Sequence, residues 1–283
     1  RGLGSFFGVF FWTFVPKKRK VLARDQILEC GLTTDAGEAM AIAKASTTRF
    51  GRMIIEVLSY PVYDKEILDK KIVFHGKEYL DELKESGEGA IFMASHAGNW
   101  ELLGAYLAMS GYPLISVAQQ QDNKGSDTFI NEYRAMMKQH VTYKTGIRDM
   151  VRFLAKGHYI GLLMDQDPGY TGIMVKLFGR DTLTADGPAK LAGIQNYPIL
   201  SIFIHEDRPY HYVVEALPPI RPYTSDAPLS KEEKKRIVYD VTQLNDRLEA
   251  HIRKYPDEWF WLHNRWKWTK RYKEKQKLKA QQN

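Results

Sequence analysis

The chain has 283 residues, of which 44% are apolar and 27% are charged, so it can bury a sizeable core. The formal net charge of +7 favours an anionic partner, such as an acidic lipid surface, an acidic carrier protein or nucleic acid. A single cysteine, Cys30, excludes an intrachain disulfide and a thiolate metal cluster.

The N-terminal segment is apolar and ends in a basic cluster. Phenylalanines recur at helical spacing in residues 3–15, and Pro16 and the basic residues 17–20 follow. The apolar run is shorter than the roughly 20 residues that span a bilayer. We interpret it as an interfacial helix, or as the end of a single N-terminal anchor that is partly missing from this chain. A buried core helix is the alternative.

The next elements follow from hydrophobic periodicity. Residues 36–60 carry apolar residues at helical spacing, and from residue 71 short apolar runs alternate with amphipathic stretches. This alternation predicts an α/β fold, with a mixed, partly parallel sheet flanked by helices and a helical N-terminal cap. Strands are expected at 72–74, 90–94, 114–118, 159–164, 173–177, 199–204 and 211–216, and helices at 77–86, 100–110, 127–138, 147–156, 185–195 and 231–255.

A strand, a turn and a helix meet in residues 90–104, AIFMASHAGNWELLG. Asn99 is suited to cap the helix, and backbone N–H groups at the helix start can bind an oxyanion. His96 and Glu101 face each other only if His96 lies in the turn, because on one helix they would diverge by about 140°. A histidine whose second ring nitrogen is held by a carboxylate can deprotonate a substrate hydroxyl. A purely structural pair is the alternative.

Two further groups have more than one interpretation. Asp165 and Asp167 flank Gln166 after an apolar run, which favours a turn that organises the site over a magnesium site. The aromatic and basic residues of 259–268 suit a membrane interface or single-stranded nucleic acid, although packing against the sheet is the alternative.

Four blocks resemble the lysophospholipid acyltransferase superfamily, and the similarity is greatest to the late acyltransferases of bacterial lipid A biosynthesis. Those proteins have a glutamate where Glu101 stands. The blocks span much of the chain and occur in the family's order. They are SHAGNWE (95–101), LLMDQDPG (162–169), KLFGRDTLTADGPAKLA (176–192) and PDEWFWLHNRWK (256–267).

The resemblance implies a glycerolipid acyltransferase-like fold and transfer of a fatty acyl chain to a hydroxyl of a lipid A precursor. The donor would be a thioester of acyl carrier protein or of coenzyme A, with no metal or prosthetic group. His96 and Glu101 would be catalytic, with His96 as general base and Glu101 as its orienting carboxylate. The substrate-binding or oxyanion residues would be Asn99, Gln119, Arg134, Asp165 and Gln166.

One departure concerns the segment after the strand at 114–118. Many family members have Arg-Pro there, whereas this chain has Gln119 and Gln120. If that arginine assists the oxyanion or a substrate phosphate, its role passes here to Gln119, Arg134 or the backbone.

The resemblance also implies a place and partners for the chain. We expect it at the cytoplasmic face of the bacterial inner membrane, with acyl carrier protein, a membrane lipid acceptor and an anionic membrane surface as partners, and no nucleic acid. Three parts are expected: a membrane-associated segment (1–20), an acyltransferase domain (21–268) and a basic tail (269–283). A lysophospholipid or another glycolipid is the alternative acceptor. A basic nucleic-acid-binding module is the alternative from another class.

Overall fold

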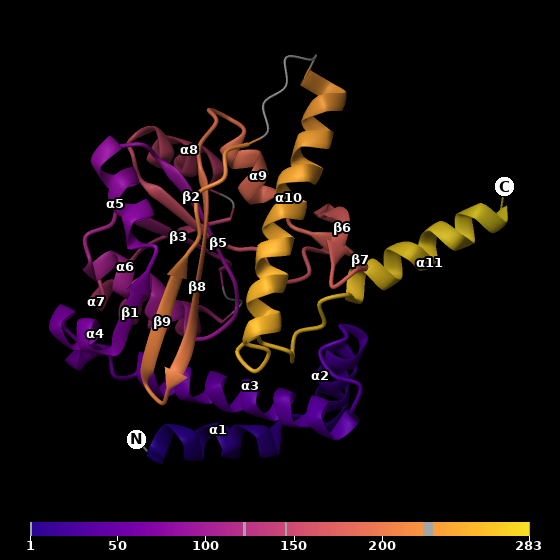
Figure 1. The fold of residues 1–283 in the computed structure, drawn as a ribbon, viewed down its shortest axis with the longest axis horizontal. Coiled ribbons are helices and arrows are strands. Elements are labelled where there is room, and N and C mark those ends of the chain that lie inside the picture. The colour runs from indigo at the N-terminus through magenta and orange to yellow at the C-terminus, as the bar shows by residue number, and fades with distance from the viewer. Residues whose placement is uncertain (1, 121–122, 145, 223–228, 283) are drawn as a thin grey trace.

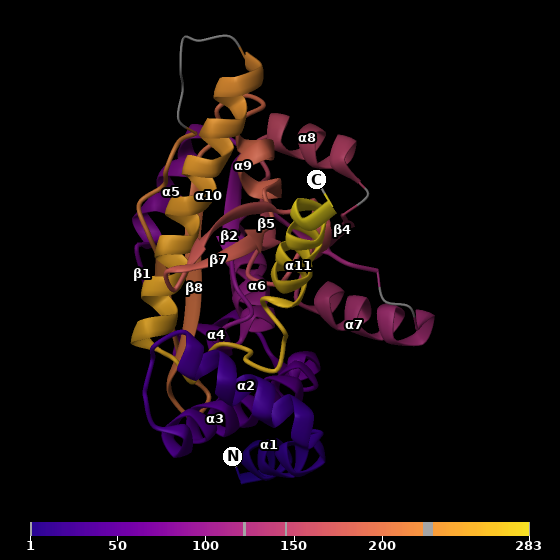
Figure 2. The ribbon, with the colours of Figure 1, turned by 90° about the vertical axis from the view of Figure 1, so that its right-hand side faces the viewer.

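The computed structural model describes residues 2–120, 123–144, 146–222 and 229–282. Its N-terminal helices are α1 (Gly2–Phe14), α2 (Lys17–Glu29) and α3 (Ala36–Val57). Both α1 and α2 pack against α3, and the three helices gather at one end of the molecule (Figures 1 and 2). At Gly8 the approach is close enough that a Cβ atom would overlap the backbone of Thr48. The expected helical N-terminal cap is confirmed.

The strands are β1 (Ile72–His75), β2 (Ala90–Ala94), β3 (Leu114–Ala118), β4 (His140–Tyr143), β5 (Tyr159–Leu163), β6 (Ile173–Leu177), β7 (Arg180–Thr184), β8 (Ile199–Arg208) and β9 (His211–Ala216). In the described part of the chain, the main sheet has the order β1-β9-β8-β2-β5-β3-β4. Its neighbouring strands are parallel except for the antiparallel pair β8–β9. A separate antiparallel ribbon contains β6 and β7. The expected mixed, partly parallel sheet is confirmed, and most of its strand pairs are parallel.

The elements outside the sheet and the cap are η1 (Tyr60–Val62), α4 (Lys65–Lys71), α5 (Lys77–Ser86), α6 (Trp100–Met109), α7 (Lys124–Met136), α8 (Ile147–Ala155), η2 (Gly169–Thr171), α9 (Gly187–Ala192), α10 (Leu229–Lys254) and α11 (Lys267–Gln282). Alternate side chains of a strand face opposite ways, so β2 contributes to two hydrophobic cores. Phe92 and Ala94 pack with residues of α4, α5 and α6. Ile91 and Met93 pack with residues of α8, α9 and α10. Helices therefore cover both faces, as a parallel sheet requires.

Some elements differ from the sequence-based expectation. The structure adds α4, β4 and β7, extends β8 to Arg208 and begins α7 at Lys124. β4 lies at the edge of the sheet and has no fully buried residue, so the sequence carries little periodic signal for it. The expected boundary between residues 20 and 21 falls inside α2, and the one between 268 and 269 falls inside α11. The division into three domains stays a prediction.

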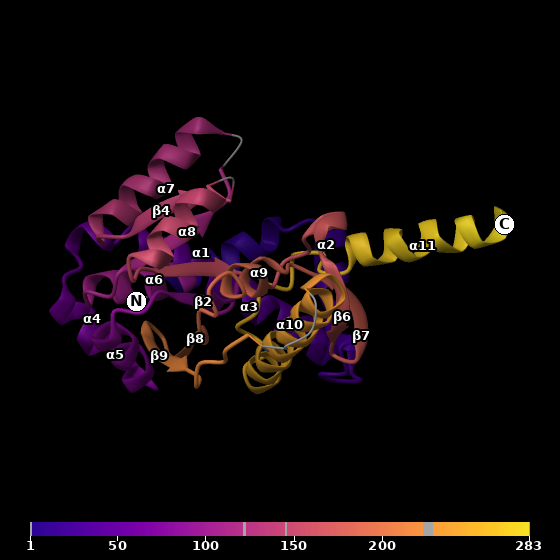
Figure 3. The ribbon, with the colours of Figure 1, turned by 90° about the horizontal axis from the view of Figure 1, so that it is seen from above.

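After α10, residues 255–266 run past α2 and α3 without a helix, and α11 then extends away from the body of the molecule (Figures 1 and 3). Trp259, Trp261 and Trp266 are buried in the core. The membrane-interface interpretation is therefore wrong for these three rings, and the packed alternative is confirmed. In the described ranges, no helix combines the length and the apolar character needed to cross a membrane.

Candidate active site

His96 and Asp165 meet at the carboxyl edge of the parallel strands. His96 follows β2 and Asp165 follows β5, and these strands are parallel neighbours in which Ala94 pairs with Leu163. Because parallel neighbours end at the same edge, residues 69 positions apart become adjacent. Nδ1 of His96 lies 2.8 Å from Oδ1 of Asp165, and the backbone N–H of His96 donates to Oδ2 at 3.0 Å.

The surroundings of Asp165 keep its carboxylate ionised. Burial acts to raise the pKa of this side chain, which is only 2% exposed. The His96 ring and the hydrogen bonds from His96 and Trp259 outweigh burial and hold the pKa below its ordinary value. With Asp165 as the acceptor, Nδ1 of a neutral His96 carries the hydrogen and Nε2 is left as the basic nitrogen. Since the His96 side chain is 20% exposed, a substrate hydroxyl can reach the ring.

Glu101 does not contact His96 in the way the sequence predicts. The Arg134 guanidinium donates twice to its carboxylate, from Nε at 2.9 Å and from Nη2 at 2.7 Å. The carboxylate against His96 is Asp165, so the predicted pairing of His96 with Glu101 is wrong in this structure. Glu101 lies in the buried first turn of α6, where it needs a compensating cation, and α7 supplies one. The predicted oxyanion residue Arg134 is thus in an ion pair.

The turn between β2 and α6 is shaped by Gly98 and Asn99. Gly98 has a φ of +61°, and a Cβ atom there would overlap the backbone oxygen of Ile204. Asn99 caps α6, since its Oδ1 accepts from the Leu102 N–H at 3.0 Å, and its Nδ2 donates to Glu56 at 3.0 Å. The predicted cap is confirmed, and both polar atoms of the Asn99 side chain are committed to structural contacts.

The remaining predicted residues lie at the same edge of the sheet. Gln166 is half-buried after β5 and Gln119 is exposed after β3, and these strands are neighbours. Asp167 organises a turn, as expected: its Oδ1 accepts from the Gly169 N–H at 3.0 Å and its Oδ2 from the Trp268 N–H at 2.8 Å. Within the described residues, no group of three or more histidine, cysteine or acidic side chains is arranged to hold a metal ion.

The loop that carries His96 is held by the segment after α10, which sequence reasoning did not assign to the site. The Phe260 N–H donates to the His96 carbonyl at 3.0 Å, and the Gly98 N–H donates to the Glu258 carbonyl at 3.1 Å. Ala97 and Trp259 pair as an antiparallel bridge between these bonds. The loop therefore lies against a short extended segment that fixes its backbone.

The same segment holds the loop that carries Asp165. The Trp259 indole N–H donates to Asp165 Oδ2 at 2.7 Å, and the Asp167 backbone N–H donates to Nε2 of His263 at 3.1 Å. Burial, the largest effect, lowers the pKa of His263 and favours its neutral form. The block 256–267 is visible in the sequence, but nothing in its residue types reveals these contacts.

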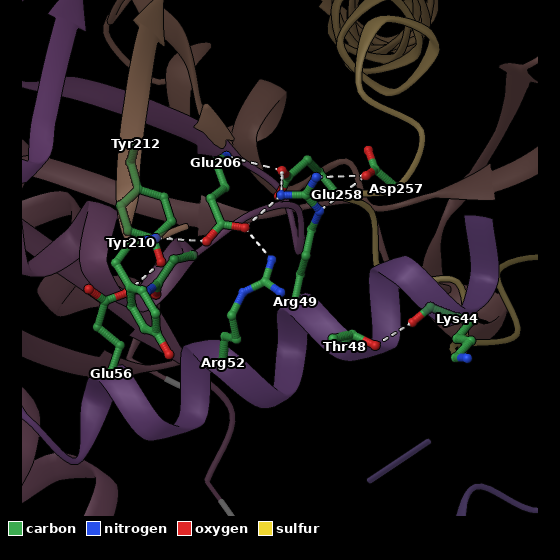
Figure 4. A network of polar contacts seen from close by, with 11 residues as sticks. Lys44, Thr48, Arg49, Arg52, Glu56, Glu206, Tyr210, Tyr212, Asp257 and Glu258 are labelled. Carbon is green, nitrogen blue, oxygen red and sulfur yellow. Dashed lines mark hydrogen bonds and ion pairs between the residues drawn. The ribbon is translucent and has the colours of Figure 1, made fainter. Parts of the chain in front are cut away.

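Arg49 of α3 fixes the start of this segment (Figure 4). Its guanidinium lies 2.7 Å from carboxylate oxygens of Glu206, Asp257 and Glu258. Arg52 adds a second ion pair to Glu206. Burial raises the pKa of Glu258 to about 7 against the attraction of Arg49. The N-terminal helices are thereby tied to the backbone that supports His96.

An apolar pocket, partly open to solvent, lies between α6 and the strands β2, β3 and β5. Glu101 and Arg134 belong to its wall. Trp100 also lines the pocket and packs edge-on against His96, with 5.0 Å between ring centroids. The apolar lining includes Leu103, Leu107, Leu114, Leu162 and Ile202. The pocket is thus connected to His96 through one shared side chain.

Aromatic rings continue from Trp100 to α1. The Phe50 ring lies 5.9 Å from Trp100, 4.8 Å from Phe260 and 5.8 Å from Phe11, measured between centroids. Phe11 is exposed on α1. A row of aromatic rings therefore leads from the surface of the N-terminal helices to the His96 ring.

The sequence matches the bacterial lipid A biosynthesis acyltransferase family over residues 1–268. A phosphatidylinositol mannoside acyltransferase of Mycolicibacterium smegmatis is 25% identical, over 80% of this chain and 72% of that protein. Lipid A biosynthesis acyltransferase 2 of Shigella flexneri is 22% identical, over 74% of this chain and 65% of that protein. Among solved structures, the 1-acyl-sn-glycerophosphate acyltransferase PlsC of Thermotoga maritima is similar, with 14% identity and a TM-score of 0.38, over 88% of this chain and 97% of that chain.

A histidine held by a buried carboxylate at the carboxyl edge of a parallel α/β sheet is suited to the deprotonation of a hydroxyl. The fold is of the α/β class, and the site has the groups that activation of a hydroxyl requires. The chain belongs to the bacterial lipid A biosynthesis acyltransferase family, and it is an acyltransferase. The family expected from the four sequence blocks is confirmed.

Proposed function

We propose that this acyltransferase moves a fatty acyl chain from a thioester to a hydroxyl of a glycolipid, with His96 as general base and Asp165 as its orienting carboxylate. The observation that carries the proposal is the 2.8 Å contact between His96 Nδ1 and Asp165 Oδ1. Nε2 takes the proton of the acceptor hydroxyl while the hydroxyl oxygen attacks the carbonyl carbon of the thioester. The imidazolium then protonates the departing thiolate, so the histidine is neutral again at the end of the cycle.

The apolar pocket is the proposed site of the acyl chain. Its aliphatic lining can bury a fatty acyl chain and so remove the apolar surface of the chain from water. Trp100 lies between the pocket and His96, so a chain in the pocket brings its thioester end near the general base. The Glu101–Arg134 ion pair forms part of the pocket wall, and we propose that it shapes the pocket rather than taking part in proton transfer.

The acceptor we propose first is a lipid A precursor, as the family description and the name of the Shigella relative suggest. The mycobacterial relatives act, by their names, on phosphatidylinositol mannoside, which is also a glycolipid. Both acceptor classes offer sugar hydroxyls to an activated acyl group. The shared chemistry is therefore O-acylation of a glycolipid, with a lysophospholipid as the alternative acceptor.

A lipid acceptor requires access to a bilayer surface, and we propose that α1 provides it at the cytoplasmic face of the inner membrane. Phe10, Phe11 and Phe14 are exposed on this helix, and the basic residues 17–20 begin α2 beside it. Apolar rings next to cations suit the interface of an anionic membrane. The aromatic row from Phe11 to Trp100 then leads from that interface to His96.

The proposed donor is the acyl carrier protein, whose acidic surface suits a basic enzyme, with coenzyme A as the alternative.

The test is an acyl-transfer assay that follows donor and acceptor together. The purified chain is incubated with an acyl carrier protein thioester, or the coenzyme A thioester of the same acyl group, and vesicles that contain one acceptor. The acceptors are a lipid A precursor, phosphatidylinositol mannoside and lysophosphatidic acid. We expect a glycolipid to gain the mass of one acyl group for each thiol released. Thioester hydrolysis without an acylated lipid would refute the proposal, and transfer to lysophosphatidic acid alone would replace the acceptor.

A further inference from the structure

We propose that Trp259 is a positioning residue for acyl transfer, whose indole N–H holds the Asp165 carboxylate in the orientation that presents Oδ1 to His96. This inference rests on the proposed roles of His96 and Asp165. Trp259 does not touch substrate in this proposal, and it acts through the carboxylate alone.

Three hydrogen bonds fix the Asp165 carboxylate. Oδ1 faces His96 Nδ1 at 2.8 Å, whereas Oδ2 accepts from the His96 backbone N–H at 3.0 Å and from the Trp259 indole at 2.7 Å. Within the described residues, the hydrogen bonds to this carboxylate come from His96 and Trp259. Trp259 is therefore the donor that lies outside His96, and together with the His96 backbone N–H it can hold the carboxylate plane while the His96 ring exchanges protons.

The indole is itself held in place. Trp259 is 4% exposed, and its backbone bridges Ala97 and accepts a hydrogen bond from the Ser46 hydroxyl. Its ring packs against Trp261 at 4.6 Å and against Phe178 at 6.4 Å between centroids. Because packing fixes the indole, its N–H keeps one position, and the carboxylate must stay in one orientation to keep this hydrogen bond. The indole is therefore a preorganised support for the carboxylate.

The charged groups around Asp165 do not replace this bond. Burial lowers the pKa of His263 and so favours its neutral form. Burial lowers the pKa of Arg265 to about 10, so the guanidinium remains charged near neutral pH. That guanidinium donates to the Leu183 carbonyl at 2.6 Å and to the Thr184 hydroxyl at 2.7 Å, and it acts on Asp165 only through its field. Among the described residues, the ionisable group with the largest effect on the carboxylate is the His96 ring.

Loss of the indole N–H has consequences that loss of packing alone does not have. The freed carboxylate can turn away from Nδ1, so kcat falls while KM, which reports contacts with the substrate, stays nearly the same. A carboxylate that has turned away from Nδ1 also stabilises the imidazolium form of His96 less. The base is then deprotonated more easily, and the acid limb of the pH–rate profile moves to lower pH.

The experiment compares Trp259→Phe with Trp266→Phe. Both tryptophans are buried, but the Trp266 indole N–H has no hydrogen-bond partner among the described residues, so its replacement removes ring volume and no bond. We expect kcat of Trp259→Phe to fall roughly 10- to 100-fold, as for a lost bond to an ionised group, with an acid limb at lower pH. Trp266→Phe should keep the wild-type profile. A Trp259→Phe variant with wild-type kcat, or equal losses in both variants with unchanged profiles, would overturn the proposal.

Two further measurements separate the outcomes. In an Asp165→Asn background, adding Trp259→Phe should change kcat less than 3-fold, because the bond it removes no longer serves an ionised carboxylate. Independent losses that multiply would overturn the proposal. If Trp259→Phe does not fold, ¹⁵N spectra of the wild type and Asp165→Asn decide: one of the six indole N–H signals must shift strongly. Activity that persists in His96→Ala and Asp165→Asn would instead refute the proposed function.

Discussion

Asp165 and Glu101 are both carboxylates of the site, but their contacts give them different roles. Asp165 accepts from His96 and Trp259, so it controls the orientation of the His96 ring. Glu101 forms a two-point ion pair with Arg134 between α6 and α7. In the proposed mechanism, one carboxylate therefore acts on proton transfer, and the other joins two helices at the wall of the pocket.

Glu101→Gln should lower stability more than it lowers turnover. Arg134 is largely buried, and the replacement removes its counter-charge. The loss of one partner of a buried ion pair lowers the free energy of unfolding by about 3 kcal/mol. Thermal unfolding followed by circular dichroism measures this as a lower midpoint. Arg152→Gln is the control, because it breaks an exposed ion pair with Asp149 and should change the midpoint little. Equal shifts of the unfolding midpoint in the two variants would show that the Glu101–Arg134 pair stabilises the fold no more than an exposed ion pair does.

At this scale the sequence predicts the site residues better than their pairing. His96, Asp165 and Gln166 were assigned to the site from their blocks and lie at one edge of the sheet. The pairing failed because five-residue spacing is a local signal, whereas the His96–Asp165 contact depends on β2 and β5 being neighbours. The order of strands in a sheet depends on pairing between distant segments, so no single segment of the sequence predicts it. Trp259 was missed for the same reason, since its indole reaches Asp165 only after the chain returns from α10.

At the scale of elements, the site lies at the carboxyl edge of the sheet, and the segment after α10 packs against the loops at this edge. β2 and β5 deliver His96 and Asp165, and the segment around Glu258 supports both loops. α3 in turn anchors that segment through Arg49 (Figure 4). The geometry around His96 and Asp165 thus depends on packing between the N-terminal helices and the chain after α10.

Glu258 should make stability depend on pH near neutrality. Burial raises its folded-state pKa to about 7, so the folded protein favours the protonated form. This contribution is fully present below the ordinary pKa near 4.5 and is lost as the pH rises through about 7. The free energy of unfolding, measured by urea titration from pH 5 to 8, should therefore fall less steeply in Glu258→Gln than in the wild type.

The comparison of these two proteins is needed because other groups titrate in the same range. Burial lowers the pKa of His251 to about 3, and this gives the opposite slope, since protonation below pH 6.5 then opposes folding. Identical slopes in the wild type and Glu258→Gln would contradict the raised pKa of Glu258.

The elements with strong periodicity were predicted from the sequence, including β2, β3, β6, β9 and α5 with the bounds that the structure has. β4 and β7 were missed. β4 is an edge strand of four residues, and β7 contains Arg180, Asp181 and two threonines, so neither shows an apolar run. The aromatic residues of 259–268 looked exposed because tryptophan next to basic residues is ambiguous in sequence. Trp259, Trp261 and Trp266 are buried because they pack in one core cluster with residues of α2, α3 and the sheet.

At the scale of the whole molecule, the apolar surface of α1 lies at the end where the site is. α1 packs on α3, and α3 contacts both the segment around Glu258 and the Asn99 cap. A lipid surface that binds α1 would therefore lie on the side of the molecule to which the carboxyl edge of the sheet points (Figures 1 and 2).

Substitution of Phe10 and Phe14 by serine should weaken binding to vesicles at every salt concentration. These side chains are 48% and 69% exposed, and their transfer to a lipid interface is an apolar term that salt does not screen. Replacing Lys17 and Lys18 by glutamine should weaken binding mainly at low salt and on anionic vesicles, by about 1 kcal/mol per charge. Co-sedimentation with vesicles measures both effects.

The matched control replaces exposed apolar residues elsewhere on the surface. Val73 and Ile147 are 56% and 59% exposed and do not belong to the N-terminal helices. Val73→Ser with Ile147→Ser should leave vesicle binding unchanged. If this control weakens binding as much as the α1 variant, or if the wild type stays in the supernatant with anionic vesicles at low salt, α1 is not the docking surface.

The central claim is that His96, oriented by Asp165, removes the proton of the acceptor hydroxyl. The single-turnover rate of acyl transfer to the glycolipid, measured by mass spectrometry for His96→Ala, Asp165→Asn and Glu101→Gln, tests it most directly. We expect His96→Ala and Asp165→Asn to be slower by roughly 10²- to 10⁴-fold, the range of general base catalysis, and Glu101→Gln to stay within about tenfold of the wild type. A near-wild-type rate in His96→Ala or Asp165→Asn would contradict the claim.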